Sequence, residues 1–238
     1  MNPSGKSSPA LSVIIPVHNE AGTLGGIVER LTARAAQFAP GLEIIIIDDG
    51  STDRSAAILD RLALCHPIRV IRHPHRLGTG AARKRGHSVA RGRWLAWIDA
   101  DGTYDPEDIF HLWDCAAEGV DQIIGARPHP FKGPQRWRNL LKRIIFKWAS
   151  WRFRRPIPDL NSGLRLIRRE AARTWESRLP DGFSCASTAT LQAFRHGQTI
   201  LFHGIAYHTR PPNAPSKFHP VLDTWRMLKV VTACPVLR

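Results

Sequence analysis

Short apolar runs alternate with amphipathic stretches over the first half of the chain. Five runs have the composition and length of buried strands, and they cover residues 11–15, 43–47, 68–71, 94–98 and 122–124. The stretches that separate them have helical spacing and cover about 23–38, 52–63, 78–90 and a segment from 105 onward. Strands separated by helices of this length predict an α/β fold, with a mostly parallel sheet flanked by helices.

Acidic residues follow three of these strands. Glu20 comes shortly after the first strand, Asp48 and Asp49 end the second, and Asp99 and Asp101 follow the fourth. In such sheets the ligand binds beyond the carboxyl ends of the strands. Each acid alone could be a helix cap or a turn former. Together we expect them to converge on one crevice, where a cation or a hydroxyl-rich ligand offsets their mutual repulsion.

The segment Asp99-Ala100-Asp101 is the most specific of these acidic features. Two carboxylates one residue apart, just past a strand, can share one divalent ion. Magnesium is often held by one or two carboxylates together with substrate phosphates. The spacing alone is frequent by chance, but here it follows a buried strand and two other acidic strand ends. We therefore expect Asp99 and Asp101 to hold Mg²⁺ or Mn²⁺ against a diphosphate.

The chain of 238 residues has a formal net charge of +14, and this charge is unevenly placed. Residues 127–173 hold fourteen Lys and Arg against two acids, so that the rest of the chain is close to neutral. The length suits one domain. The charge predicts an anionic partner, which could be nucleic acid, anionic lipid or a phosphorylated substrate.

Within the basic middle an apolar stripe has helical spacing. Its members are Trp137, Leu140, Leu141, Ile144, Ile145, Trp148 and Trp151. Basic residues occupy the other faces, and such a helix is typical of a membrane surface. The alternative is that the stripe packs on the sheet and the charges are only solvated. Residues 225–231 predict a second, weaker element of this kind.

The remaining sequence limits the class of protein. The four cysteines, Cys65, Cys115, Cys185 and Cys234, are widely spaced, so we expect neither a zinc site nor a disulfide framework. Unpaired cysteines fit a protein of the reducing cytosol. Residues 1–10 are polar and lack the apolar core of a signal peptide. The apolar runs are shorter than the ~18–20 residues that cross a bilayer.

Several motifs resemble those of family-2 glycosyltransferases, nucleotide-sugar enzymes of the GT-A fold. The segments 13–20 (VIIPVHNE), 44–53 (IIIIDDGSTD) and 98–101 (IDAD) occur in that family's order and spacing. The segment 78–86 is similar to the family's glycine-rich segment. The segment 159–166 (DLNSGLRL) and Arg210 followed by Ser216-Lys217 resemble the polyprenyl-phosphate sugar transferases, the dolichyl-phosphate mannose synthase group.

The resemblance implies roles for the matching positions. Near the base and ribose of a nucleotide-sugar donor it places Pro16, His18, Glu20, Ile47 and Asp49. Around the diphosphate and metal it places Ile98, Asp99, Ala100 and Asp101, and toward the phosphates Arg127, Arg210 and Lys217. Asp101 and Arg127 are the expected catalytic residues. The sequence departs from the group at His18, where Tyr is usual, and at Gly102-Thr103, where Leu or Leu-Gln is common.

The predicted function is an inverting glycosyltransferase that moves a sugar from GDP-mannose or a UDP-sugar to a polyprenyl phosphate. A phosphate monoester has a second pKa near ~6, so at pH 7 it needs little help from a general base. Arg127, Arg136 and Arg138 are the expected ligands of the acceptor phosphate. We expect the enzyme to lie in the cytoplasm, peripherally on the inner face of the membrane.

Three alternatives remain open at this point. A family-2 enzyme could instead act on a hydroxyl acceptor in polysaccharide or glycolipid synthesis. A basic nucleic-acid-binding protein would explain the charge, but acidic strand ends repel phosphate, so no nucleic-acid partner is expected. The third alternative is a Rossmann dehydrogenase. It would need the motif GxGxxG after the first strand, but this chain has PVHNE there, which argues against that class.

The predicted organisation has three parts. Residues 1–10 form a disordered tail, and 11–216 form the GT-A domain, which includes the basic amphipathic segment 136–155. Residues 217–238 form a C-terminal amphipathic segment that associates with the membrane.

Overall fold

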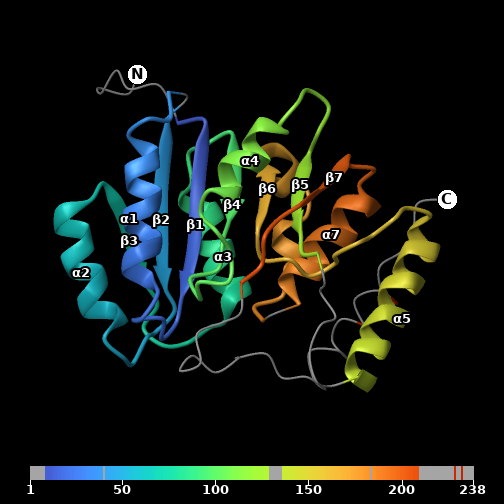
Figure 1. Ribbon diagram of the computed structural model, residues 1–238, viewed down its shortest axis with the longest axis horizontal. Coiled ribbons are helices and arrows are strands. Elements are labelled where there is room, and N and C mark those ends of the chain that lie inside the picture. The colour runs from blue at the N-terminus through green and yellow to red at the C-terminus, as the bar shows by residue number, and fades with distance from the viewer. Residues whose placement is uncertain are drawn as a thin grey trace.

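The computed structural model describes residues 9–39, 41–128, 136–182 and 184–208, with 228 and 232, and side chains in its longest helix from residue 144 onward. A seven-stranded sheet in the order β3-β2-β1-β4-β6-β5-β7 forms the centre of the molecule (Figure 1). The strands are β1 Leu11–Val17, β2 Leu42–Asp48, β3 Ile68–Arg72, β4 Trp94–Trp97, β5 Gln122–Ala126, β6 Arg165–Arg168 and β7 Ile200–Gly204.

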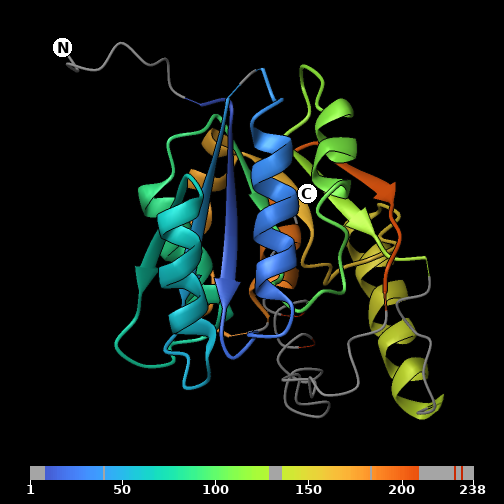
Figure 2. The same cartoon turned by 60° about the vertical axis from the view of Figure 1, so that its left-hand side comes forward.

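Helices cover both faces of this sheet (Figures 1 and 2). They are α1 Leu24–Ala35, α2 Ser55–Cys65, α3 Thr79–Val89, α4 Asp108–Asp114, α5 Arg136–Phe153, α6 Arg169–Arg173, the 3₁₀ turn η1 Glu176–Arg178, and α7 Cys185–Arg195. Apolar residues of α1, α2 and α4 pack in one core cluster, and those of α3, α6 and α7 pack in a second cluster on the opposite face. The predicted sheet with helices on both faces is confirmed.

The strand directions agree with the prediction of a mostly parallel sheet. β1 pairs in parallel with β2 and with β4, and β2 pairs in parallel with β3. Every β1 residue except Pro16 is buried, because the strand lies between two others and is covered on both faces. Within the described ranges β6 is the exception, since it runs antiparallel to both β4 and β5.

The apolar face of α5 differs from the predicted stripe. Ile145 belongs to that stripe, but it is buried together with Phe146, Ala149 and Phe153 in a cluster that includes Leu191 of α7. Because these four side chains recur at helical spacing, they hold α5 against α7. Ile144 and Trp151 lie on a different face and are 54% and 76% exposed. The stripe therefore splits between a packed face and an exposed face.

Some predictions lie partly or wholly outside the described residues. Most of the tail 1–10 is outside them, and so is 217–238 apart from 228 and 232. In the described part of the chain, Cys65, Cys115 and Cys185 form no disulfide. A search of the same residues finds no helix with both the length and the apolar character for crossing a membrane.

Candidate active site

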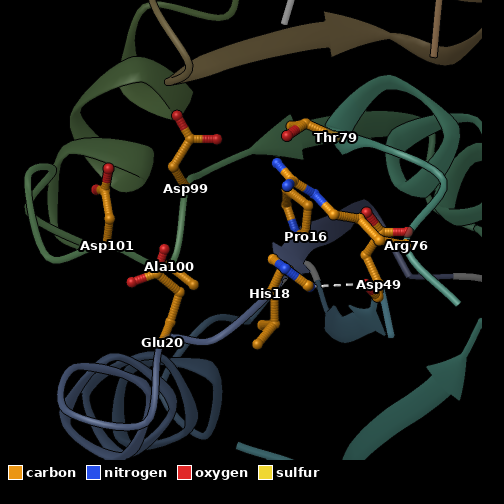
Figure 3. A pocket seen from close by; sticks show the side chains of 10 residues that line it. Pro16, His18, Glu20, Asp49, Arg76, Thr79, Asp99, Ala100 and Asp101 are labelled. Atoms are coloured by element: carbon orange, nitrogen blue, oxygen red, sulfur yellow. Dashed lines mark hydrogen bonds between the residues drawn. The ribbon is translucent and has the colours of Figure 1, made fainter. Parts of the chain in front are cut away.

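A pocket lies beyond the carboxyl ends of β1, β2 and β4 (Figure 3). Its lining residues are Pro16, Val17, His18, Glu20, Asp49, Arg76, Thr79, Asp99, Ala100 and Asp101. Figure 3 shows Glu20, Asp99 and Asp101 on one side, with Arg76 and Thr79 on the other. The expected convergence of three acidic strand ends is confirmed.

The loops after β1 and β2 are joined by hydrogen bonds through Asn19. Its Oδ1 accepts the backbone N–H groups of Thr52 at 2.7 Å and Asp53 at 3.2 Å, and its own N–H donates to Ser51 Oγ at 3.1 Å. Asn19 has φ of +54°, a left-handed conformation that asparagine tolerates better than most residues. The conformation lets one side chain fix two loops, and it sets the position of the neighbouring His18.

Hydrogen bonds join the start of α1 to the start of α2 and to the segment after β4. The Glu20 N–H donates to Ser55 Oγ at 2.9 Å, at the start of α2. The Thr23 hydroxyl donates to the carbonyl of Ala100 at 2.5 Å. Thr23 is the N-cap residue of α1, but its side chain makes no capping bond. It connects Glu20 to the Asp99–Asp101 segment instead.

Asp49 anchors the loop that carries Arg76. Its carboxylate accepts hydrogen bonds from His73 Nδ1 at 2.8 Å, from the Leu77 N–H at 2.9 Å and from the Gly78 N–H at 2.8 Å. Burial alone would raise the pKa of this carboxyl, but the three hydrogen bonds outweigh burial and hold the pKa below its usual value. Asp49 is thus a charged anchor that brings the 76–79 loop to the pocket.

The ring of His18 is oriented by the main chain of Asp49. Its Nδ1 lies 2.9 Å from the carbonyl oxygen of Asp49. A carbonyl only accepts hydrogen bonds, so Nδ1 carries a proton. In the neutral ring the other nitrogen, Nε2, is then a hydrogen-bond acceptor.

The two aspartates of the Asp99-Ala100-Asp101 segment have different surroundings. Asp99 Oδ1 is paired with Arg83 at 2.7 Å. Asp101 Oδ1 accepts the Thr103 hydroxyl at 2.5 Å and the Thr103 N–H at 3.1 Å. The protein therefore engages at least one oxygen of each carboxylate, which restricts how the side chain can turn.

The segment 159–165 forms the layer behind Asp99. The Gly163 N–H donates to the buried Tyr104 hydroxyl at 2.8 Å, and burial raises the pKa of that hydroxyl. A Cβ on Gly163 would lie 2.0 Å from Asp99 Oδ2, so only glycine allows this approach. Arg165 is fully buried, and its Nε and NH2 donate to the Ser162 carbonyl at 3.1 and 2.7 Å. The motif that the sequence singled out is thus packed against the acidic pocket wall.

Seven of the predicted site residues line the pocket: Pro16, His18, Glu20, Asp49, Asp99, Ala100 and Asp101. Ile47 and Ile98 are fully buried in the core clusters of opposite faces. Arg127 is paired with Asp159 at 2.7 Å and is not among the lining residues. Arg136 and Arg138 lie in α5 where side chains are not described, and Arg210 and Lys217 lie outside the described residues.

Sequence reasoning did not single out three of the lining residues. They are Val17, Arg76 and Thr79. Of the described residues in the lining, Arg76 is the one lysine or arginine. Their position could have indicated Arg76 and Thr79. The loop 73–79 follows the third strand, and the carboxyl end of that strand lies at the same edge of the sheet as the acids.

The acidic side of the pocket fits a divalent cation that is shared with a ligand. Carboxylate oxygens are the ligands that Mg²⁺ prefers, and it commonly uses only one or two of them. In the described ranges no group of three or more His, Cys, Asp or Glu side chains converges as a complete metal site. A cation at Asp99 and Asp101 would therefore draw further ligands from phosphate oxygens and water.

Comparison with known proteins identifies the family. The sequence profile of "Glycosyl transferase family 2" matches residues 12–175. A polyprenol monophosphomannose synthase from Mycolicibacterium smegmatis is 30% identical over 213 residues, which are 83% of this chain and 77% of that protein. The chain belongs to glycosyltransferase family 2. It is thus a glycosyltransferase, and the resemblance noted in its motifs is confirmed.

Other relatives of this family-2 glycosyltransferase are longer proteins. An undecaprenyl-phosphate 4-deoxy-4-formamido-L-arabinose transferase from Pseudomonas paraeruginosa is 33% identical over 57% of this chain and 40% of its own length. A dodecaprenyl-phosphate galacturonate synthase from Rhizobium johnstonii is 35% identical over 59% of this chain and 40% of its own length. The match to these two relatives therefore spans less than half of each. The names of both refer to a polyprenyl phosphate.

Solved structures support the fold of this glycosyltransferase. Glucosyl-3-phosphoglycerate synthase from Mycobacterium tuberculosis, crystallised with Mn²⁺, UDP-glucose and phosphoglyceric acid, has a TM-score of 0.69 at 19% identity. The match covers 97% of this chain and 81% of that one. The likeness confirms the GT-A type of α/β fold.

Proposed function

We propose that this glycosyltransferase moves a sugar from a nucleotide-sugar to a polyprenyl phosphate, with Mg²⁺ or Mn²⁺ bound at the pocket. The observation that carries the proposal is the arrangement of Glu20, Asp99 and Asp101 opposite Arg76, beyond the ends of parallel strands. The names of the relatives, which refer to polyprenol or polyprenyl phosphates, support the acceptor class.

The nucleotide would occupy the part of the pocket formed by the loops after β1 and β2. Pro16, His18, Glu20 and Asp49 line it, and the hydrogen-bonded loops hold them in place before a ligand arrives. Ile47 and Ile98 would act from beneath by packing, because their side chains are fully buried. The proposed donor is GDP-mannose or a UDP-sugar.

Asp99 and Asp101 would hold the divalent cation against the donor diphosphate, around Ala100. When bound, such a cation offsets the negative charge that grows on the leaving nucleoside diphosphate. Asp101 and Arg127 are the residues that we assign to this transition state. Arg210 and Lys217 are assigned to the phosphates from their sequence positions alone.

The acceptor phosphate would attack the anomeric carbon opposite the leaving group, which inverts its configuration. Arg127, Arg136 and Arg138 are the proposed ligands of that phosphate, since guanidinium groups bind phosphate oxygens in pairs. Arg127 is already bonded to Asp159, so it would offer the phosphate only the donors that this pair leaves.

We place the enzyme on the inner face of the cytoplasmic membrane, where a lipid acceptor would be reached. The exposed face of α5 supports this placement, because it combines Ile144 and Trp151 with the exposed Lys147. Residues 217–238 are proposed as a second contact, after a GT-A domain that ends near 216 and follows the tail 1–10.

The test is a panel of nucleotide-sugars, offered with polyprenyl phosphate and Mg²⁺ or Mn²⁺. Transfer of labelled sugar into organic solvent is the expected result with one donor. Free polyprenol, which lacks the phosphate, should give no product. Equal rates on polyprenol and polyprenyl phosphate would contradict the proposal and favour a hydroxyl acceptor.

A further inference from the structure

Arg83 of α3 is a fully enclosed cation next to the pocket. Its NH2 donates to Asp99 Oδ1 at 2.7 Å, and its NH1 donates to the sulfur of Cys185 at 3.0 Å. Its guanidinium carbon lies 4.5 Å from the centre of the Trp97 ring. The side chain thus joins α3, the segment after β4 and the first turn of α7.

The groups around Arg83 leave its guanidinium little freedom. Trp97 is fully buried, and its indole N–H donates to His87 Nε2 at 2.8 Å. His87 Nδ1 is in turn 2.9 Å from Glu176 Oε2. A chain of three hydrogen-bonded side chains therefore fixes the ring against which Arg83 packs.

Arg83 remains charged in this enclosed position. A guanidinium group stays protonated in proteins, and here it forms an ion pair with Asp99 at 2.7 Å. A full positive charge is consequently held at hydrogen-bond distance from a carboxylate that faces the pocket. The other oxygen of that carboxylate, Oδ2, lies against Gly163.

We infer that Arg83 is a positioning residue that fixes the Asp99 carboxylate and offsets its charge, so that the pocket binds a divalent cation firmly only together with a nucleoside diphosphate. The inference rests on the proposed function. With the charge of Asp99 offset by Arg83, the acidic side of the pocket attracts a cation weakly, and the diphosphate supplies the missing negative charge. Removal of the Arg83 charge takes away the 2.7 Å ion pair that holds Asp99 Oδ1.

The inference predicts that loss of the Arg83 charge raises the affinity for Mn²⁺ without nucleotide but lowers turnover. Without nucleotide, Arg83→Met should bind Mn²⁺ about tenfold more tightly than wild type, because a nearby positive charge is lost. Its turnover should nevertheless fall by at least about tenfold, because Asp99 is no longer held. Arg83→Lys keeps the charge, so its Mn²⁺ affinity should return to the wild-type value, with turnover between the two.

The experiment is a Mn²⁺ titration followed by electron paramagnetic resonance, with Mn²⁺ alone and with GDP or UDP present. Arg85→Met is the matched control, since Arg85 is an exposed residue of the same helix and the charge change is equal. It should leave affinity and turnover unchanged. Circular dichroism checks that each variant is folded. If Arg83→Met is not folded, Arg83→Gln repeats the loss of charge with a side chain that can still donate to Asp99.

The outcomes separate the inference from the function on which it rests. If wild type does not bind Mn²⁺ in the presence of GDP or in the presence of UDP, the proposed function fails. If wild type binds Mn²⁺ with nucleotide while the folded Met or Gln variant has wild-type Mn²⁺ affinity without nucleotide, the inference about Arg83 is overturned. A Lys variant that binds as tightly as the Met variant would also overturn it.

Discussion

Arg127 and Asp159 form a two-bonded ion pair, with Nε to Oδ2 at 2.7 Å and NH2 to Oδ1 at 2.9 Å. The same carboxylate accepts the backbone N–H of Asn161 at 3.1 Å, and the Asp159 side chain is fully buried. The pair connects the end of β5 to the segment that precedes β6. An arginine that the sequence assigns to phosphate binding therefore also holds two parts of the chain together.

Asp159→Ala should lower the free energy of unfolding by about 3–5 kcal/mol, because it removes a fully buried carboxylate and leaves the guanidinium of Arg127, which is only 17% exposed, without that partner. Denaturant unfolding monitored by circular dichroism measures the change. Asp114→Ala, at the exposed end of α4, is the control and should change stability by no more than about 0.5 kcal/mol. A loss below about 1 kcal/mol for Asp159→Ala would show that the pair is dispensable.

Asp101→Asn should reduce turnover at least ~10²-fold, since a charge-stabilising interaction worth ~3 kcal/mol is removed. Chelation of metal by EDTA should inactivate wild type to a similar degree. The rate of sugar transfer with a fixed donor measures both effects, with Asp114→Asn as the matched control. Full turnover in EDTA would contradict the role of a divalent metal.

Gly163→Ala should lower turnover at least about tenfold while the fold is kept. The added Cβ would lie 2.0 Å from Asp99 Oδ2, and the carboxylate can turn away at small cost in stability. The comparison uses Gly26→Ala in α1, where an added Cβ meets no atom within 4 Å. Wild-type turnover of a folded Gly163→Ala protein would mean that the orientation of Asp99 is unimportant.

The free energy of unfolding should fall as pH decreases from about 7 to 5, in part through His87. Burial lowers the pKa of His87, against the raising effect of Glu176, and its Nε2 accepts from Trp97 only when the ring is neutral. The unfolded chain, with a histidine pKa near ~6.5, therefore takes up the proton first, and stability is lost below that pH.

His87→Gln should flatten this slope, as measured by denaturant unfolding at several pH values. His196→Gln is the control, because burial also lowers the pKa of His196 but that residue is exposed and should contribute less. The idea fails if the slope for His87→Gln equals that of wild type. The carboxyl of Glu176, whose pKa is lowered by its hydrogen bond to His87, adds its own loss only at lower pH.

Binding to anionic vesicles should depend on the exposed face of α5. The double change Ile144→Ser and Trp151→Ser should reduce flotation, and Lys147→Glu should reduce it further, since each basic residue near such a surface contributes about 1 kcal/mol. Leu64→Ser serves as the control, because Leu64 is 87% exposed on α2, at the other end of the molecule from α5 (Figure 1). Unchanged flotation of the triple variant would exclude this face.

The sequence predicts most readily the strands with a long apolar run, such as β1 and β2. β6 was not predicted, because Arg165 and Arg168 bracket only two apolar residues and the burial of Arg165 depends on distant partners. α7 also escaped prediction, since its buried face consists largely of small residues such as Ala186, Ser187 and Ala189. The burial that would identify β6 and α7 exists only after tertiary contacts form.

The same distinction applies to the site. Acids that follow strands could be placed by topology, since all parallel strands end at one edge. The ion pair of Arg83 with Asp99 and the anchoring of the 76–79 loop by Asp49 could not, because they depend on distances between separate elements. The predicted stripe of α5 includes Ile145, which is buried, and Trp148, which packs against the same cluster, since a helix with apolar residues on two faces does not reveal which one is packed.

The antiparallel position of β6 affects the order in which the protein can assemble during synthesis. Of the described strands, β5 pairs only with β6 and β7, which both follow it in the chain. A nascent chain that has reached β5 can thus complete β3-β2-β1-β4, but β5 must wait for about forty further residues before it finds a partner. Until β6 leaves the ribosome, the free edge of β4 is exposed to unwanted pairing, so this interval is where a chaperone would be most useful.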